Sequence, residues 1–349
     1  MSKLLSYRDI TLVPRVISTQ EHRDGNTSVK FCGGVLDVPI VSSPMPDVTD
    51  DRMASALAMR GALGIIHRFQ PIETQINQFR NVAYSDVGNL ATKVACAIGV
   101  TGDYRSRFEK LYGAGCRIFC LDTANGANVQ VKYVMEWLQG YAGDKIKTIA
   151  GNVATRQGFK FLADLGVDAI RVGIAGGSVC ETRTETGVYY PMVSSILDCC
   201  KAKYSSVYTG WEEGTIEFGA DLYPTTALIA DGGIKEPSDM CKALAVGADV
   251  VMCGSIFAGT KDAPGDPIFD ANVGKLYKKY RGAASFGVQR DYKGDNPRHV
   301  EGREILVEYK REHASEVISR FKEGLQSSMS YMDATDLEQF RYKVGVEVL

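Results

Sequence analysis

The stretch TALIADGGIKEPSDMCKALAVGADVVMCGS, residues 226–255, contains a complete strand–helix–strand unit. Its two ends, TALIADGG and DVVMCGS, are short and almost continuously apolar, which is typical of strands buried on both faces of a parallel sheet. The segment between them, PSDMCKALAVGA, has an apolar stripe at helical spacing and ends in glycine, a common helix stop. This unit predicts an α/β fold.

The same alternation extends over most of the chain. The earlier apolar runs are VPIVSS (38–43), ALGIIH (62–67), TKVACAIG (92–99), RIFCLDT (117–123), IKTIAGN (146–152) and DAIRVGI (168–174). Segments of good helix formers lie between several of these runs. Eight alternations favour a closed (β/α)8 barrel, or TIM barrel, over an open sheet. No low-complexity linker interrupts them, so we expect residues 1–349 to form a single catalytic domain.

Composition excludes several classes of protein. The chain has 349 residues, 45% of them apolar, and a formal net charge of -2 without a basic block. Nucleic acid and anionic membranes are therefore unexpected partners. The nine cysteines have neither zinc-site nor disulfide-scaffold spacing. There is no signal-peptide pattern and no uninterrupted apolar run of about 18 residues, so we expect a soluble, cytoplasmic protein.

Polar or small residues stand where most of the predicted strands end. They are Ser42, Ser43, His67, Asp122, Gly151, Asn152, Gly173, Asp231, Gly232, Gly233, Gly254 and Ser255. In a barrel these ends face one mouth, where the active site is built. The glycines of DGGI and CGS, with GGS at 176–178, offer unobstructed backbone N–H groups to a phosphate. Asp231 would then lie near a sugar attached to that phosphate.

One thiol stands apart from the other cysteines. Cys180 follows the sixth strand within RVGIAGGSVCETRTETGVYYP (171–191), among glycines, hydroxyls and charges such as Arg183. A thiol on such a loop is a candidate nucleophile, whereas most other cysteines lie in apolar runs and are interpreted as small buried hydrophobes. The alternative, an inert loop cysteine, remains open at this point.

Two regions fall outside the repeat. Residues 203–224 lengthen the connection before the seventh strand, and residues 281–310 lack barrel periodicity and are rich in glycine, arginine and aspartate. A long segment without regular structure in a compact enzyme is often a lid. We therefore expect residues 281–310 to form a mobile flap towards the C-terminus.

These motifs resemble the IMP dehydrogenase/GMP reductase family in order and spacing. The matching segments are SYRDITLVP (6–14), PIVSSPM (39–45), GALGIIHR (61–68), GNVAT (151–155), GSVCETR (177–183), 230–255, YRGAAS (280–285) and EGREILVEYK (301–310). The resemblance implies a TIM barrel in which Cys180 attacks C2 of a purine nucleotide. It also implies that the nucleotide is held by Ser43, Met45, Ser178, Asp231, Gly232, Gly233, Gly254, Ser255, Tyr280, Arg281 and Gly282.

Within this family the chain is more similar to the reductases. The space between His67 and Thr92 is too short for the regulatory (CBS) insertion that dehydrogenases typically carry. LDTANG (121–126) and TRTETGVYYP (182–191) look like the reductase versions of their loops. By that match Thr182 and Glu301 handle the departing ammonia, and Asp122, Asn125 and Gly126 face the cofactor, NADPH. The resemblance implies reductive deamination of GMP to IMP by a homotetramer.

The match has departures. The family's GxGPGS loop is GIAGGS here, which puts potassium binding by the backbone of Gly173, Ala175 and Cys180 in doubt. The family's Met-Asp-Thr is Met45-Pro46-Asp47, and Ala283 replaces a methionine. Three alternatives stay open: an IMP dehydrogenase without its regulatory domain, a nucleotide-binding protein without turnover, and a flavin-dependent barrel oxidoreductase.

Overall fold

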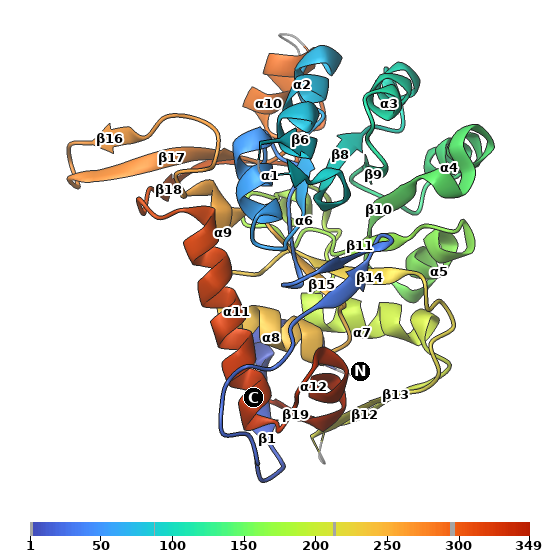
Figure 1. The fold of residues 1–349 in the computed structure, drawn as a ribbon, viewed down its shortest axis with the longest axis vertical. Coiled ribbons are helices and arrows are strands. Elements are labelled where there is room, and N and C mark those ends of the chain that lie inside the picture. Colours follow the sequence, from blue (N-terminus) through green and yellow to red (C-terminus); the bar gives the residue numbers. More distant parts are fainter. Residues whose placement is uncertain (1–2, 87, 212–213, 294–296) are drawn as a thin grey trace.

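The computed structural model describes residues 3–86, 88–211, 214–293 and 297–349, and its centre is a sheet of eight parallel strands (Figure 1). In spatial order these are β4 (Ile40–Ser42), β15 (Val250–Cys253), β14 (Ala227–Asp231), β11 (Ala169–Val172), β10 (Lys147–Val153), β9 (Ile118–Asp122), β8 (Val94–Ile98) and β5 (Gly64–Ile66). The barrel closes because the Ser42 N–H donates to the Leu63 carbonyl (3.0 Å) and the Leu63 N–H to Ile40 (3.2 Å). The prediction of a TIM barrel is confirmed.

Helices surround this barrel. The main ones are α1 (Asp51–Ala58), α2 (Ile72–Ala83), α3 (Tyr104–Gly113), α4 (Val129–Ala142), α5 (Arg156–Asp164), α7 (Met192–Lys203), α8 (Pro237–Ala245) and α11 (Ala314–Tyr331). Several of these helices have a side-chain N-cap. Asp50 caps α1 by accepting from the Met53 N–H, and Thr155 caps α5 by accepting from the Gly158 N–H. Short helices α6 (Thr182–Thr186), α9 (Ser255–Ala258), α10 (Phe286–Lys293) and α12 (Leu337–Lys343) complete the set.

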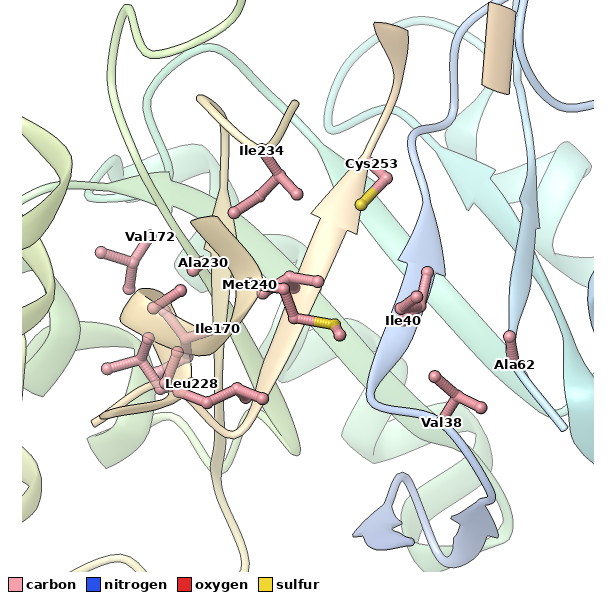
Figure 2. Close-up of a cluster of buried hydrophobic side chains, with 14 of the residues drawn as sticks. Val38, Ile40, Ala62, Ile170, Val172, Leu228, Ala230, Ile234, Met240 and Cys253 are labelled. Carbon is pink, nitrogen blue, oxygen red and sulfur yellow. The ribbon is translucent and has the colours of Figure 1, made fainter. Parts of the chain in front are cut away.

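The strands are buried on both faces, which explains their unbroken apolar runs. In β14, Ile229 packs in the barrel interior, whereas Leu228 and Ala230 pack outward against the helical layer. Figure 2 shows this outer layer, where side chains of β11 and β14 gather with Met240 of α8. Full burial of one such leucine contributes about 1.5–3 kcal/mol. The packing therefore fixes the register that brings the strand ends to one mouth.

Small two-stranded sheets pack around the barrel, and one of them covers the end opposite that mouth. The hairpin β2 (Val29–Phe31) and β3 (Gly34–Leu36) sends Phe31 and Leu36 into the interior cluster. The chain ends pair as β1 (Ile10–Pro14) and β19 (Val344–Val348). The 203–224 insertion forms a second hairpin, β12 (Val207–Gly210) and β13 (Thr215–Phe218), against β19. A third, very short hairpin comprises β6 (Tyr84–Ser85) and β7 (Gly88–Asn89).

The segment after the barrel strands has regular structure of its own. Strands β16 (Ile268–Asp270), β17 (Lys275–Arg281) and β18 (Glu304–Glu308) form an antiparallel sheet that extends away from the barrel in Figure 1. Within 281–310, the described residues form helix α10 and the whole of strand β18. The expectation of a segment without regular structure is therefore wrong for these residues, and mobility stays a prediction. No helix in the described ranges is both long and apolar enough to cross a bilayer.

Candidate active site

A cavity of about 530 Å³ opens at the carboxyl ends of the strands. Its walls come from the loops after β4, β9, β11, β14 and β15, and from the chain around Tyr280 and Glu301. Most of the residues expected to bind or react lie on it: Ser43, Met45, Asp122, Gly173, Ala175, Ser178, Cys180, Thr182, Asp231, Gly232, Gly233, Gly254, Ser255, Tyr280, Gly282 and Glu301. The strand-end pattern thus brings them to one place.

Three of the expected residues do not line the cavity. Asn125 turns back on its own loop, where its Oδ1 accepts from the Ala127 N–H (3.1 Å). Gly126 packs against Gly151, and a Cβ built on it would lie 2.8 Å from the Gly151 Cα. Arg281 is engaged elsewhere. At the end of β9, the cavity instead has Thr123 and Ala124 beside Asp122.

A hydrogen-bonded chain connects the thiol to a carboxylate. The Cys180 Sγ lies 3.2 Å from the Thr182 Oγ1, and this hydroxyl donates to the Glu301 Oε2 over 2.8 Å. Because the single hydroxyl hydrogen of Thr182 points to Glu301, the thiol is the donor in the first bond. A proton can therefore pass from sulfur through the hydroxyl to the carboxylate.

Residues far apart in sequence hold this chain together. The Glu181 N–H donates to the Glu301 carbonyl (2.8 Å), and the Arg303 N–H donates to the Val179 carbonyl (3.0 Å). The Arg303 guanidinium also donates twice to the Ser178 carbonyl, at 2.8 and 3.1 Å. Sequence reasoning missed Arg303, whose only signal was its place inside the EGREILVEYK motif.

The expected phosphate seat is a cluster of hydroxyls around a glycine. A Cβ on Gly254 would lie 2.6 Å from the Tyr280 Oη and 3.2 Å from the Ser43 Oγ, so both hydroxyls crowd the bare backbone. Burial raises the pKa of Tyr280, which keeps its hydroxyl protonated and able to donate. The backbones of Gly232 and Gly176 also touch, since a Cβ on Gly232 would come within 2.8 Å of the Gly176 carbonyl carbon.

Arg281 binds Asp47, the carboxylate of the divergent Met45-Pro46-Asp47 segment. Its Nε and NH2 groups donate to the Asp47 Oδ2 (2.8 Å) and Oδ1 (2.7 Å), and its NH1 reaches Asp291 of α10 at 2.9 Å. Asp47 is buried. Arg281 therefore ties the loop after β4 to α10, one residue from Tyr280, instead of lining the cavity itself.

Two acidic side chains that line the cavity, from strands β9 and β14, share one arginine. Arg171 pairs with Asp122 through NH1 (2.8 Å) and with Asp231 through NH2 (2.9 Å). Burial opposes ionisation of Asp122, but the charges of Arg171 and Arg68 hold its pKa below the ordinary value. Asp122 is therefore a carboxylate at neutral pH, able to accept from hydroxyl or amide groups of a ligand.

The environment of Cys180 differs from that of the other cysteines. Seven of the nine are buried, and burial raises the pKa of Cys241 to about 11 and that of Cys120 to about 12. Cys32 is half-buried but lies in the β2–β3 turn, at the other end of the barrel. Arg183, expected beside the thiol, lies over the Tyr189 ring at 4.4 Å.

The potassium prediction stays untested. The Gly173 carbonyl, one of the expected ligands, accepts from the Asn152 Nδ2 at 2.8 Å. Ala175 adopts a left-handed conformation with φ of 59°, which shapes the loop in place of the family's glycine. Across the described part of the chain there is no group of three or more His, Cys, Asp or Glu side chains that could hold a metal ion.

Comparison with known proteins identifies the domain. The model of the IMP dehydrogenase / GMP reductase domain matches residues 4–348. A GMP reductase of Chromobacterium violaceum is 33% identical over 99% of this chain and 98% of its own length. An inosine-5'-monophosphate dehydrogenase of Cryptosporidium parvum is 32% identical over 97% of this chain and 90% of its own. That of Streptococcus pyogenes is 35% identical over 80% of this chain and 54% of its own.

Proposed function

Because this chain belongs to the IMP dehydrogenase/GMP reductase family, we propose that it catalyses the NADPH-dependent reductive deamination of GMP, or of a closely related guanine nucleotide, to IMP and ammonia. The observation that carries the proposal is the hydrogen-bonded chain from Cys180 through Thr182 to Glu301. Deamination needs both a nucleophile for C2 and an acid for the leaving nitrogen, and this chain supplies both.

The reaction begins with the thiol. Cys180 gives its proton through Thr182 to Glu301, and the resulting thiolate attacks C2 of the guanine to form a carbon–sulfur bond. Glu301 then returns that proton through the hydroxyl to the amino nitrogen, which leaves as ammonia with the electrons of the carbon–nitrogen bond. The same proton thus serves activation of the nucleophile and departure of the amine.

Reduction completes the conversion. When bound, NADPH would supply the hydride that takes the place of the amino group at C2. The carbon–sulfur bond then breaks, its electrons return to Cys180, and IMP is released. The thiolate takes up a proton from solvent before the next cycle. Asp122, with Thr123 and Ala124, lines the side of the cavity where the nicotinamide half would lie, and its carboxylate suits the hydroxyl and carboxamide donors of that group.

The nucleotide would lie across the glycine loops. Its phosphate would accept from the hydroxyls of Ser43, Ser178 and Tyr280 and from the backbone N–H groups near Gly254. Asp231 would accept from the ribose hydroxyls. The subunits would assemble as a homotetramer, as the family resemblance implies.

A direct test follows nicotinamide absorbance with two substrate pairs. The purified protein should oxidise NADPH in the presence of GMP and release ammonia. Turnover with IMP and NAD alone would refute the reductase assignment.

The second candidate is an IMP dehydrogenase without a regulatory domain. Its specific support is Arg298, which is exposed and lines the cavity, and which could activate a water molecule there. Arg290 of α10, by contrast, pairs with Asp291 at 3.4 Å. XMP formation from IMP and NAD, abolished in Arg298→Ala, would favour this candidate.

A further inference from the structure

Arg171 occupies an unusual place in the barrel. It lies on β11, and its side chain is only 9% exposed although it lines the cavity. Its neighbour on β10 is Gly151, where a Cβ would come within 2.6 Å of the Arg171 Cβ. The glycine therefore leaves room for the arginine beside β10, in the direction of β9.

The guanidinium joins two strands that do not pair with each other. It binds Asp122 at the end of β9 through NH1 (2.8 Å), and Asp231 at the end of β14 through Nε (3.0 Å) and NH2 (2.9 Å). In the sheet, β10 and β11 stand between these strands. A single buried cation thus forms ion pairs with the ends of two non-adjacent strands.

The arrangement divides the oxygens of Asp231 between two tasks. Its Oδ2 accepts from Arg171 and from the Asn152 Nδ2 (2.8 Å). Among the described residues no donor reaches its Oδ1, so that oxygen remains available to a ligand hydroxyl. Any movement of Arg171 towards Asp231 would bring a competing donor to Oδ1, and any movement away would release the carboxylate.

We propose that Arg171 is a positioning residue that couples the nucleotide subsite at Asp231 to the cofactor subsite at Asp122. This inference rests on the proposed function for the identity of the two ligands. Asp122 holds one edge of the guanidinium in place, and this keeps Arg171 on Oδ2 and leaves Oδ1 to the ribose. Neutralising Asp122 therefore changes nucleotide affinity through Arg171, although Asp122 lies on the cofactor side.

A double-mutant cycle tests this coupling. The dissociation constant of GMP is measured by calorimetry, without cofactor, for the wild type, Asp122→Asn, Arg171→Met and the double variant. Asp122→Asn should weaken GMP binding by about tenfold in the wild-type background and by less than about twofold in Arg171→Met. Arg171→Lys keeps the charge but lacks the guanidinium group that bridges both carboxylates. This variant should therefore restore only part of the coupling that is lost in Arg171→Met.

Arg341→Lys is the matched control, because Arg341 is also buried against an aspartate. It bonds Asp249 (3.2 Å) at the start of β15, at the other end of the barrel. This variant should lower the melting temperature and leave GMP affinity unchanged. Equal effects of Asp122→Asn in both backgrounds would overturn the coupling. Wild-type protein that binds no GMP at all would instead overturn the proposed function.

Discussion

Replacing Thr182 by valine removes one hydroxyl and keeps the shape of the side chain, so it tests the proton path alone. In the structure this hydroxyl is the link between sulfur and carboxylate, at 3.2 Å from the Cys180 Sγ and 2.8 Å from the Glu301 Oε2. Among the described residues, no hydrogen bond joins the thiol to Glu301 directly. In the proposed mechanism, loss of this hydroxyl deprives the thiol of its proton acceptor and the leaving amine of its proton source.

The magnitude follows from these two losses. A positioned acid–base group contributes about 10²–10⁴ in rate, so Thr182→Val should lower kcat by about a hundred- to a thousandfold, or about 3–4 kcal/mol. GMP affinity should change by less than about threefold, because Thr182 is not part of the phosphate seat. Steady-state NADPH oxidation and GMP calorimetry give the two quantities. Thr184→Val, on the exposed side of the same helix, should leave both unchanged. The reasoning is refuted if Thr182→Val retains more than about a third of wild-type kcat.

Three further predictions concern the nucleophile, the pH dependence of stability and the flap. Cys180→Ser should lower turnover by at least about a thousandfold, roughly 4 kcal/mol, with GMP still bound, whereas Cys96→Ala should cost about 1 kcal/mol of stability and leave kcat unchanged. Burial and two neighbouring arginines lower the pKa of His67 to about 4, below its ordinary value of about 6.5. The unfolded state therefore binds this proton more readily than the folded state does. The free energy of unfolding should consequently fall as the pH drops from about 6.5 to about 4. In chemical denaturation, His67→Asn should reduce this fall by on the order of 3 kcal/mol. If the free energy of unfolding depends on pH in the same way in His67→Asn and in the exposed-site variant His22→Asn, His67 is not the group responsible. Limited proteolysis within residues 281–310 should slow when GMP is bound, and equal cleavage rates would count against a lid.

The barrel architecture was predictable from the sequence because strands buried on both faces require apolar residues at successive positions. A strand such as β14, packed on the interior through Ile229 and on α8 through Leu228, has to be apolar at successive positions. Polar residues are then confined to strand ends, and in a parallel barrel those ends converge. This is why the sequence alone predicts that Asp122, Asp231 and Cys180 lie at one mouth of the barrel.

The parts that escaped prediction depend on contacts between distant segments. The bonds from Arg303 to Ser178 join residues 125 positions apart, and those from Arg281 to Asp47 join residues 234 apart. Side-chain direction at such contacts is set by the packing of whole loops, which periodicity does not encode. For the same reason Asn125, one loop position past the cavity, could not be separated from Asp122 by sequence alone.

The central claim is that Cys180 mediates replacement of the guanine amino group by hydride. The most direct measurement supplies GMP with an isotopically labelled amino nitrogen together with NADPH deuterated at the transferable position. The account predicts labelled ammonia and IMP with deuterium at C2, formed in equal amounts by the wild type and by neither Cys180→Ser nor Cys180→Ala. Label retained in the purine, or turnover seen only as oxidation of IMP to XMP, would contradict it.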